Sequence, residues 1–354
     1  MKFQLFVAAL AGLLLAFTGS TASARQPKAE SSATRAPCPP KAADDKDTTC
    51  IVFKLASDVV PSSSAQLYNG YRVKGTDWPA LALAAFDYVD NLGRPATYTC
   101  TATLLGPRVL LTAAHCVDMG KKSQFRTAHL IAGERTIKVY CDPDPRYFES
   151  DPNGLAPRNS YDFALCELSW QGATTPVPLT KITFETIDVT TPLKRQDPVV
   201  MVGYGCANMS VEDHSRIVFV TDLKTLRAAG ETIELGVGEE KGTPATVRTR
   251  SPKGKEPALC KGDSGGPMLS GIIVVPPDAA DGLASIQRVG LRRVRGVNSS
   301  VDFDENTAAP EDFLSRVVAL QGTGFQTYVA WWRGRHTSAQ ICGWDKDMRP
   351  CEED

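Results

Sequence analysis

The sequence lacks the features that mark several large classes of protein. It has 39 Lys and Arg against 40 Asp and Glu, and this balance gives no overall attraction to nucleic acid or to an anionic membrane. No run after residue 24 approaches the roughly 20 apolar residues that a membrane-spanning helix needs. Zinc-site spacing is also missing, because no two cysteines form a CxxC pair and the four histidines are scattered. We therefore expect no nucleic-acid or membrane partner, no metal and no organic cofactor.

The first 24 residues have the pattern of an export signal. A lysine near the start precedes an apolar run that is too short and wrongly flanked for a membrane span, and the small residues Ala22, Ser23 and Ala24 follow it. This predicts a signal peptide over residues 1–24 and a mature protein that is secreted or periplasmic.

All ten cysteines lie beyond that cleavage site. An even number of cysteines in an exported chain favours disulfides, so we expect five bridges. Cys100 and Cys116 flank one pair of predicted strands closely enough to bond. Closing a loop of that size stabilises a fold by about 3 kcal/mol.

Composition and periodicity divide the rest of the chain into three segments. Residues 25–66 are rich in Ala, Pro, Ser and Asp, which predicts a pro-region or linker. Residues 67–335 alternate short apolar runs with turn signals, which predicts an all-β domain large enough for two packed barrels. The run FQTYVAWWRGRH predicts a helix at its end. Residues 336–354 contain Cys342 and Cys351 and form a short C-terminal extension.

The stretch CKGDSGGP, residues 260–267, surrounds one serine with small and turn-forming residues. Gly262, Gly265 and Gly266 permit a tight turn that holds Ser264 in a fixed and exposed position, as a nucleophile requires. The same stretch is also compatible with an ordinary surface turn, and alone it does not decide between the two.

Hydrolysis by a serine also needs a base, a group that orients the base, and donors for the developing oxyanion. His115, in LLTAAHC, ends an apolar strand, and Asp162 opens YDFALCEL just before a buried strand. Taken singly, the histidine is compatible with a packed core residue and the aspartate with a turn former. Their joint occurrence with Ser264 favours catalysis.

Together LTAAHC, YDFAL and CKGDSGGP resemble the motifs of the chymotrypsin-like (trypsin-like) serine proteases, over about residues 67–335. The chain order His, Asp, Ser is that of chymotrypsin. The resemblance implies two packed six-stranded antiparallel β-barrels with a C-terminal helix. It also implies a serine endopeptidase that hydrolyses protein or peptide substrates through an acyl-enzyme.

The resemblance also assigns roles. Ser264 would be the nucleophile, His115 the general base and then acid, and Asp162 the residue that holds the productive tautomer. The backbone N–H groups of Gly262 and Ser264 would form the oxyanion hole.

Asp263 would turn inward and pair with a new α-amino group released by activation cleavage. The stretch LYNG, residues 67–70, precedes Trp78 and Pro79 as the family's mature start does, so Leu67 is the expected N-terminus of an enzyme made as a zymogen. Gln66 stands where tryptic activation needs Arg or Lys. Either a different activating protease cuts here, or the pro-region is not removed this way.

Family members that cut after Arg or Lys carry an aspartate at the position of Ala258. Aligning RGVNSS with the family's substrate-binding strand places Ser299, Ser300 and Val301 along the pocket wall. A valine would narrow the pocket and favour small or medium apolar side chains at the substrate residue before the cleaved bond (P1). Asp312, if near the pocket, would instead attract a basic side chain.

The cysteine pattern departs from the family, because no cysteine lies between 260 and 342. We expect Cys206 to pair with Cys260. The remaining expected pairs are 141 with 166, 342 with 351, and 38 with 50.

Two alternatives to an active endopeptidase remain at this point. One is a catalytically inactive binding protein on the same scaffold, because a fold does not imply a function. The other is esterase-like hydrolysis by the same three residues. The complete triad and the Gly-Asp-Ser-Gly-Gly turn favour an active enzyme.

Overall fold

Short apolar runs separated by turns form β-strands throughout the described chain. The computed structural model describes residues 51–59, 67–89, 95–118, 126–149, 160–170, 175–176, 179–206, 208–212, 216–220, 225–239, 245–253, 255–278, 282–303, 312–348 and 350–352. All of these residues belong to one compact unit, Ala36–Asp354. The predicted signal peptide, the expected pair Cys38 and Cys50, and Gln66 lie outside the described residues.

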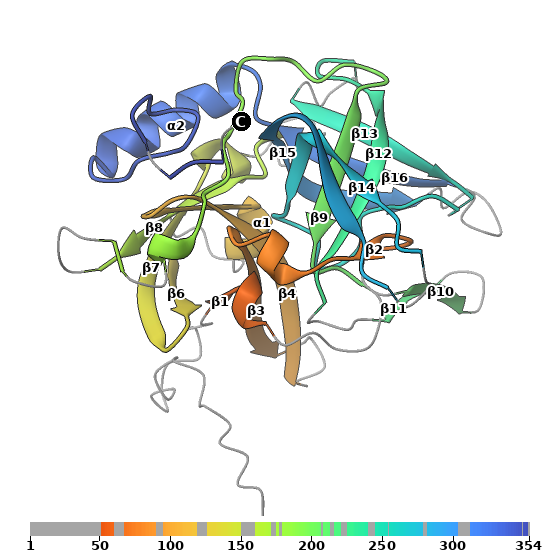
Figure 1. Cartoon of the computed structure of the whole chain (residues 1–354), viewed down its shortest axis with the longest axis horizontal. Helices are drawn as coiled ribbons and strands as arrows, with labels where there is room; N and C mark the ends of the chain where they lie inside the picture. Colours follow the sequence, from red (N-terminus) through yellow and green to blue (C-terminus); the bar gives the residue numbers. More distant parts are fainter. Residues whose placement is uncertain are drawn as a thin grey trace, which may run out of the picture. The chain divides into compact units, whose positions relative to one another are not determined.

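Seven strands close the first barrel in the order β1-β3-β4-β5-β8-β7-β6 (Figure 1). Its strands are β1 (Ile51–Leu55), β3 (Leu81–Val89), β4 (Pro95–Gly106), β5 (Val109–Thr112), β6 (Arg126–Ala132), β7 (Arg135–Pro143) and β8 (Ala164–Ser169).

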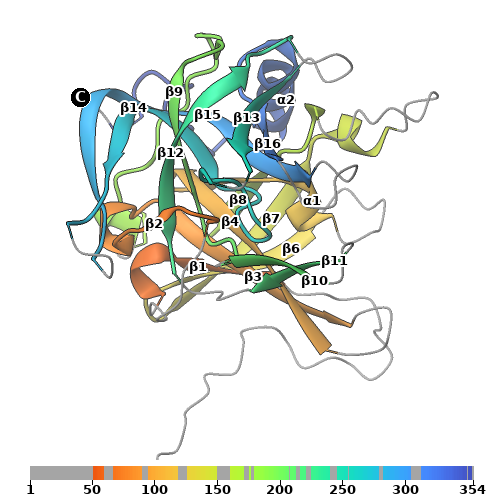
Figure 2. The same cartoon turned by 90° about the vertical axis from the view of Figure 1, so that its right-hand side faces the viewer.

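The second sheet runs in the order β13-β16-β15-β14-β9-β12-β2, and an additional pairing of β13 with β12 closes six of these strands into a barrel. The strands are β2 (Tyr71–Arg72), β9 (Pro198–Gly203), β12 (Arg227–Leu235), β13 (Thr246–Pro252), β14 (Pro267–Val275), β15 (Ser285–Phe303) and β16 (Asp312–Ala319). Strands β10 (Asn208–Glu212) and β11 (Arg216–Val220) form a separate two-stranded sheet. Figure 2 shows the green and blue strands of the second barrel beside the orange and yellow strands of the first.

The predicted two-barrel fold is confirmed, with one difference in the first barrel. Strand β1 inserts between β3, to which it is antiparallel, and β6, to which it is parallel. It lies in the segment 25–66 that the sequence predicts to be a pro-region or linker, so part of that segment forms a strand of the first barrel. The reason is the alternation in IVFKL, which buries Ile51, Phe53 and Leu55 even though the neighbouring residues are turn formers.

Helices are few in the described part of the chain. The α-helices are α1 (Ala114–Val117) and α2 (Thr323–Arg335), and the short 3₁₀ helices are η1 (Ala56–Asp58), η2 (Gly75–Asp77), η3 (Pro145–Phe148) and η5 (Leu179–Lys181). The predicted C-terminal helix is α2, and its Phe325 and Tyr328 pack against Phe163 beside β8. None of the helices described is long and apolar enough to cross a membrane.

Among the described residues, four disulfides lie within the two barrels and the C-terminal extension. Their pairs are those expected: Cys100 with Cys116, Cys141 with Cys166, Cys206 with Cys260, and Cys342 with Cys351. The extension pairs with the segment that connects the barrels, where Phe184 donates its N–H to Pro350 and accepts one from Glu352.

Candidate active site

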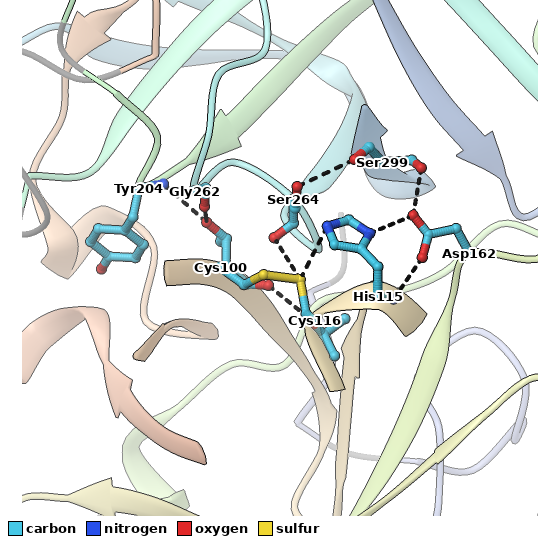
Figure 3. The surroundings of a disulfide bond; sticks show 10 residues. Cys100, His115, Cys116, Asp162, Tyr204, Gly262, Ser264 and Ser299 are labelled. Atoms are coloured by element: carbon cyan, nitrogen blue, oxygen red, sulfur yellow. Dashed lines mark hydrogen bonds and ion pairs between the residues drawn. A yellow bond between two sulfur atoms is a disulfide. The ribbon is translucent and has the colours of Figure 1, made fainter. Parts of the chain in front are cut away.

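Two neighbouring strands of the first barrel bring His115 and Asp162 together. Strand β5 leads into α1, which carries His115, and Asp162 precedes β8, which pairs with β5. His115 Nδ1 lies 2.7 Å from Asp162 Oδ2, and the His115 backbone N–H donates to Asp162 Oδ1 at 2.9 Å (Figure 3). The carboxylate thus fixes both the ring and the backbone of the histidine.

This pairing perturbs the pKa of both groups. Burial lowers the pKa of His115, but the charge and the hydrogen bond of Asp162 outweigh burial and raise it above its ordinary value. Burial raises the pKa of Asp162, but the charge of His115 and hydrogen bonds from His115 and Ser299 outweigh it and lower that pKa. Asp162 is therefore ionised at neutral pH and favours the protonated imidazole.

Ser264 lies in the turn that precedes β14 of the second barrel. Its hydroxyl donates to the carbonyl oxygen of Ser299 at 3.2 Å, and the Ser299 hydroxyl donates to Asp162 Oδ2 at 2.5 Å (Figure 3). Ser299 therefore links the serine of one barrel to the carboxylate of the other. The sequence places Ser299 in the pocket wall and does not reveal this second contact, because it depends on how β15 lies against the first barrel.

The turn around Ser264 presents the backbone N–H groups of Gly262 and Ser264. Gly262 has φ of +108° and Gly265 of +82°, a region that favours glycine. A Cβ at Gly262 would lie only 2.7 Å from the carbonyl oxygen of Tyr204. Among the described residues, the N–H groups of Gly262 and Ser264 donate no hydrogen bond. Such donors are suited to bind an oxyanion.

A disulfide fixes the other side of the histidine. The sulfur of Cys116 lies 3.8 Å from His115 Nε2 and is bonded to Cys100. These sulfurs form a cluster with His115, but as a disulfide they are not thiolates available to a metal.

Comparison with known proteins identifies the family. The profile described as Trypsin matches residues 68–286, which is more than half of the chain. The chain belongs to the trypsin family. Among solved structures, the thermostable serine protease AL20 from an extremophilic microorganism is 16% identical, with a TM-score of 0.39 over 72% of this chain and 97% of that one. The protease Anisep from Arthrobacter nicotinovorans is 13% identical, with a TM-score of 0.40 over 76% and 98%. No curated protein matches the chain.

In this trypsin-family protein the two residues expected to serve activation are buried. The Asp263 carboxylate accepts N–H bonds from Cys260 at 2.8 Å and Gly205 at 2.6 Å. Burial raises the pKa of Asp263 to about 7, against the effect of these bonds and of Arg227. Leu67 packs in the core of the second barrel.

The segment after Leu67 also reaches the expected pocket. Ala258, which is fully buried, donates its N–H to the carbonyl oxygen of Tyr68 at 3.1 Å. The first residues of the expected mature chain thus contact the residue expected at the pocket base.

Val301, expected in the pocket wall, lies opposite a residue that contacts the segment after Ala258. Val301 pairs with Ser315 across β15 and β16, and the Ser315 hydroxyl accepts the Leu259 N–H at 2.9 Å. Val301 also packs against the apolar cluster that contains Leu259 and Val317. The Ser300 hydroxyl is buried without a hydrogen-bond partner among the described residues.

Asp312 does not join this group. Its carboxylate lies 2.8 Å from Arg250 and accepts the Lys253 N–H at 3.1 Å, at the beginning of β16. Ser315, three residues further along β16, faces Leu259 instead. Sequence reasoning missed Ser315 because only the pairing of β15 with β16 sets the register.

Proposed function

We propose that this trypsin-family protein is a secreted serine endopeptidase that uses Ser264, His115 and Asp162. The observation that carries the proposal is the hydrogen-bonded series of His115, Asp162, Ser299 and Ser264. It joins the two barrels beside the N–H groups of Gly262 and Ser264, which donate no hydrogen bond within the part of the chain that the structure describes. Nothing in this reaction requires a metal or an organic cofactor.

In the first half of the reaction Ser264 attacks the carbonyl carbon of the substrate. Its hydroxyl turns from the Ser299 carbonyl toward His115 Nε2, which takes the proton as the new C–O bond forms. The oxygen of the tetrahedral intermediate accepts hydrogen bonds from the N–H groups of Gly262 and Ser264. Each such donor contributes roughly 10²- to 10³-fold to the rate.

His115 then gives this proton to the leaving amine, the peptide bond breaks, and an ester remains on Ser264. A water molecule attacks the ester, with His115 again as base, and releases the carboxylic acid and the free hydroxyl. Asp162 accepts the hydrogen bond from His115 Nδ1 throughout. Its lowered pKa keeps it ionised and ready to stabilise the imidazolium.

We expect the residue before the cleaved bond to be small or medium in size and apolar. Ala258 supplies no charge, and the contact of Val301 with the apolar cluster around Leu259 supports a narrow apolar pocket. The engagement of Asp312 by Arg250 weakens the alternative of a basic side chain.

Production as a zymogen is supported by the environment of Asp263. A buried carboxylate with a raised pKa is costly to ionise, and an α-ammonium group released at Leu67 would stabilise the ionised form in addition to the charge of Arg227. Gln66 implies an activating protease that does not require Arg or Lys. The disulfides and the predicted signal peptide support export to an oxidising compartment.

Labelling with a fluorophosphonate probe tests the nucleophile and the activation together. The samples are the chain from Arg25, the same chain cleaved to begin at Leu67, and a Ser264→Ala control. We expect label only in the cleaved form and none in the control. Equal labelling of both forms would keep the nucleophile and refute the activation step. Absence of label in both would favour an inactive binding protein.

Substrate tests separate peptidase from esterase activity. Matched peptide amides with Ala, Val, Arg or Lys before the cleaved bond, and the corresponding esters, are assayed with an untreated sample of the form that reacts with the probe. We expect amide hydrolysis, with Ala and Val preferred. Hydrolysis of esters alone would refute the peptidase assignment, and preference for Arg or Lys would refute the apolar pocket.

A further inference from the structure

Strand β1 is hydrogen-bonded on both sides although it precedes the expected activation site. Its residues from Ile51 to Leu55 pair with β3, and those from Ile51 to Lys54 pair with β6. In the barrel order β1 stands between β3 and β6. Removal of β1 would therefore leave the N–H and C=O groups along one edge of each neighbour without their partners.

The inward face of β1 belongs to the core of the first barrel. Ile51, Phe53 and Leu55 are 1%, 0% and 3% exposed. Phe53 stands opposite Ala84 on β3 and Leu130 on β6, in the same apolar cluster. Loss of β1 would expose this part of the core to water.

The residues that follow β1 also contact parts of the chain beyond Leu67. The Asp58 carboxylate accepts the N–H of Gly133, in the turn between β6 and β7, at 2.7 Å. Gly75 approaches the backbone of Ala56 so closely that a Cβ there would collide with it. Both the strand β1 and the 3₁₀ helix η1 that follows it thus contact parts of the chain beyond Leu67.

No disulfide within the chain can tether this segment across a cut at Leu67. The eight cysteines of the described residues pair among themselves, between Cys100 and Cys351. The other two, Cys38 and Cys50, both precede Leu67. Strand pairing and apolar packing are the interactions available to hold β1 after cleavage.

We infer that β1 is a permanent part of the protease domain and stays bound between β3 and β6 after the chain is cleaved before Leu67. The mature enzyme then consists of a short chain that ends before Leu67 and a long chain that carries His115, Asp162 and Ser264. The short chain completes the barrel that positions His115 and Asp162. This inference rests on the proposed cleavage, but its test does not depend on catalysis.

The test uses the full chain from Arg25 with Ser264→Ala, so that no self-digestion occurs. The recognition sequence of a site-specific protease replaces residues 61–66, and the cleaved protein is passed over a gel-filtration column under native conditions. We expect the short and long chains to elute together at equal molar amounts and to separate under denaturing conditions. Elution of the short chain by itself, with the long chain folded and monomeric, would overturn the inference.

Paired variants in β1 sharpen the test. Phe53→Asp places a charge in the core and should release the short chain upon cleavage, whereas Lys54→Ala, at a partly exposed position of the same strand, should leave it bound. Retention of the short chain by folded Phe53→Asp would contradict the proposed packing.

Hydrogen exchange on the cleaved protein decides the matter if Phe53→Asp does not fold. The amides of residues 51–55 should be protected as strongly as those of β3, and rapid exchange there would refute the inference. Gel filtration and hydrogen exchange do not depend on catalysis, so failure of the fluorophosphonate labelling would not change their results. The proposed activity and the proposed retention of β1 can therefore be refuted independently.

Discussion

His336, at the end of α2, lies between two carboxylates of the first barrel. Its Nε2 lies 2.7 Å from Asp142 Oδ2 and its Nδ1 2.8 Å from Glu167 Oε2. Both ring nitrogens can donate only in the imidazolium form. Burial lowers the pKa of His336, but the hydrogen bonds and charges of the two carboxylates outweigh it and raise that pKa. A protonated His336 therefore ties the C-terminal helix to β7 and β8.

The raised pKa determines how stability depends on pH. The stabilisation is fully present below the unfolded pKa of about 6.5 and is lost as the pH rises through the higher folded pKa. Asp142 is only 1% exposed, so His336→Ala leaves a buried charge without its partner. Breaking a buried ion pair in this way costs about 3–5 kcal/mol. The loss of stability caused by His336→Ala should be smaller at a pH above the folded pKa, where the wild-type imidazole is already neutral.

The loss of free energy of unfolding is measured by urea unfolding at about pH 5.5 and about pH 9, on the Ser264→Ala chain with and without the change at position 336. His336→Phe is the matched variant, because it can keep the stacking on Trp332, at 4.4 Å between ring centroids, and removes the charge together with the two ring hydrogen bonds. The ionic reasoning is refuted if His336→Ala loses the same free energy at both pH values, or if His336→Phe is as stable as the wild type.

Three further predictions concern the proposed catalytic site. Since Asp162 raises the pKa of His115, kcat/KM should fall as the pH decreases, with a midpoint above about pH 6.5. A midpoint below about pH 6 in the pH–rate profile would contradict the assignment of His115 as the base. Ser299→Ala removes one charge-assisted hydrogen bond to Asp162, of about 1.5–3 kcal/mol, and should lower kcat about 10- to 100-fold. Ser299→Thr keeps the hydroxyl and should retain activity. An unchanged kcat in the alanine variant would exclude a positioning role for Ser299. Gly262→Ala should reduce kcat roughly 10²- to 10³-fold in the same steady-state assay, because a Cβ at this position would collide with the carbonyl oxygen of Tyr204. Full activity of this variant would rule out an oxyanion hole that includes the Gly262 N–H.

Local patterns predict many of the elements of this protein. Alternating apolar residues predict β-strands because a sheet with one buried face requires period two, and this anticipated an all-β domain. The resemblance to chymotrypsin-like proteases implied the two barrels. The apolar spacing in FQTYVAWWRGRH likewise predicted α2, where Tyr328 and Trp332 are buried. Short motifs around His115, Asp162 and Ser264 predicted the candidate site, since each motif holds its residue by local turn or strand-end geometry.

Contacts between distant segments required the tertiary structure. The pattern IVFKL is that of a strand, but its partners β3 and β6 begin tens of residues later, and composition assigned the surrounding segment to a pro-region. The pairing of β15 with β16 decided that Ser315 reaches Leu259 while Asp312 pairs with Arg250.

The sequence by itself determined the kind of fold and the residues of the candidate triad, because these depend on local periodicity, composition and motif. It suggested the disulfide pairs, and the structure decided them. Only the tertiary structure decided the seventh strand of the first barrel, the bridge through Ser299 and the partners of His336. Each of these depends on which strand edges and side chains the folded chain brings together, and that register is set by packing across the whole domain.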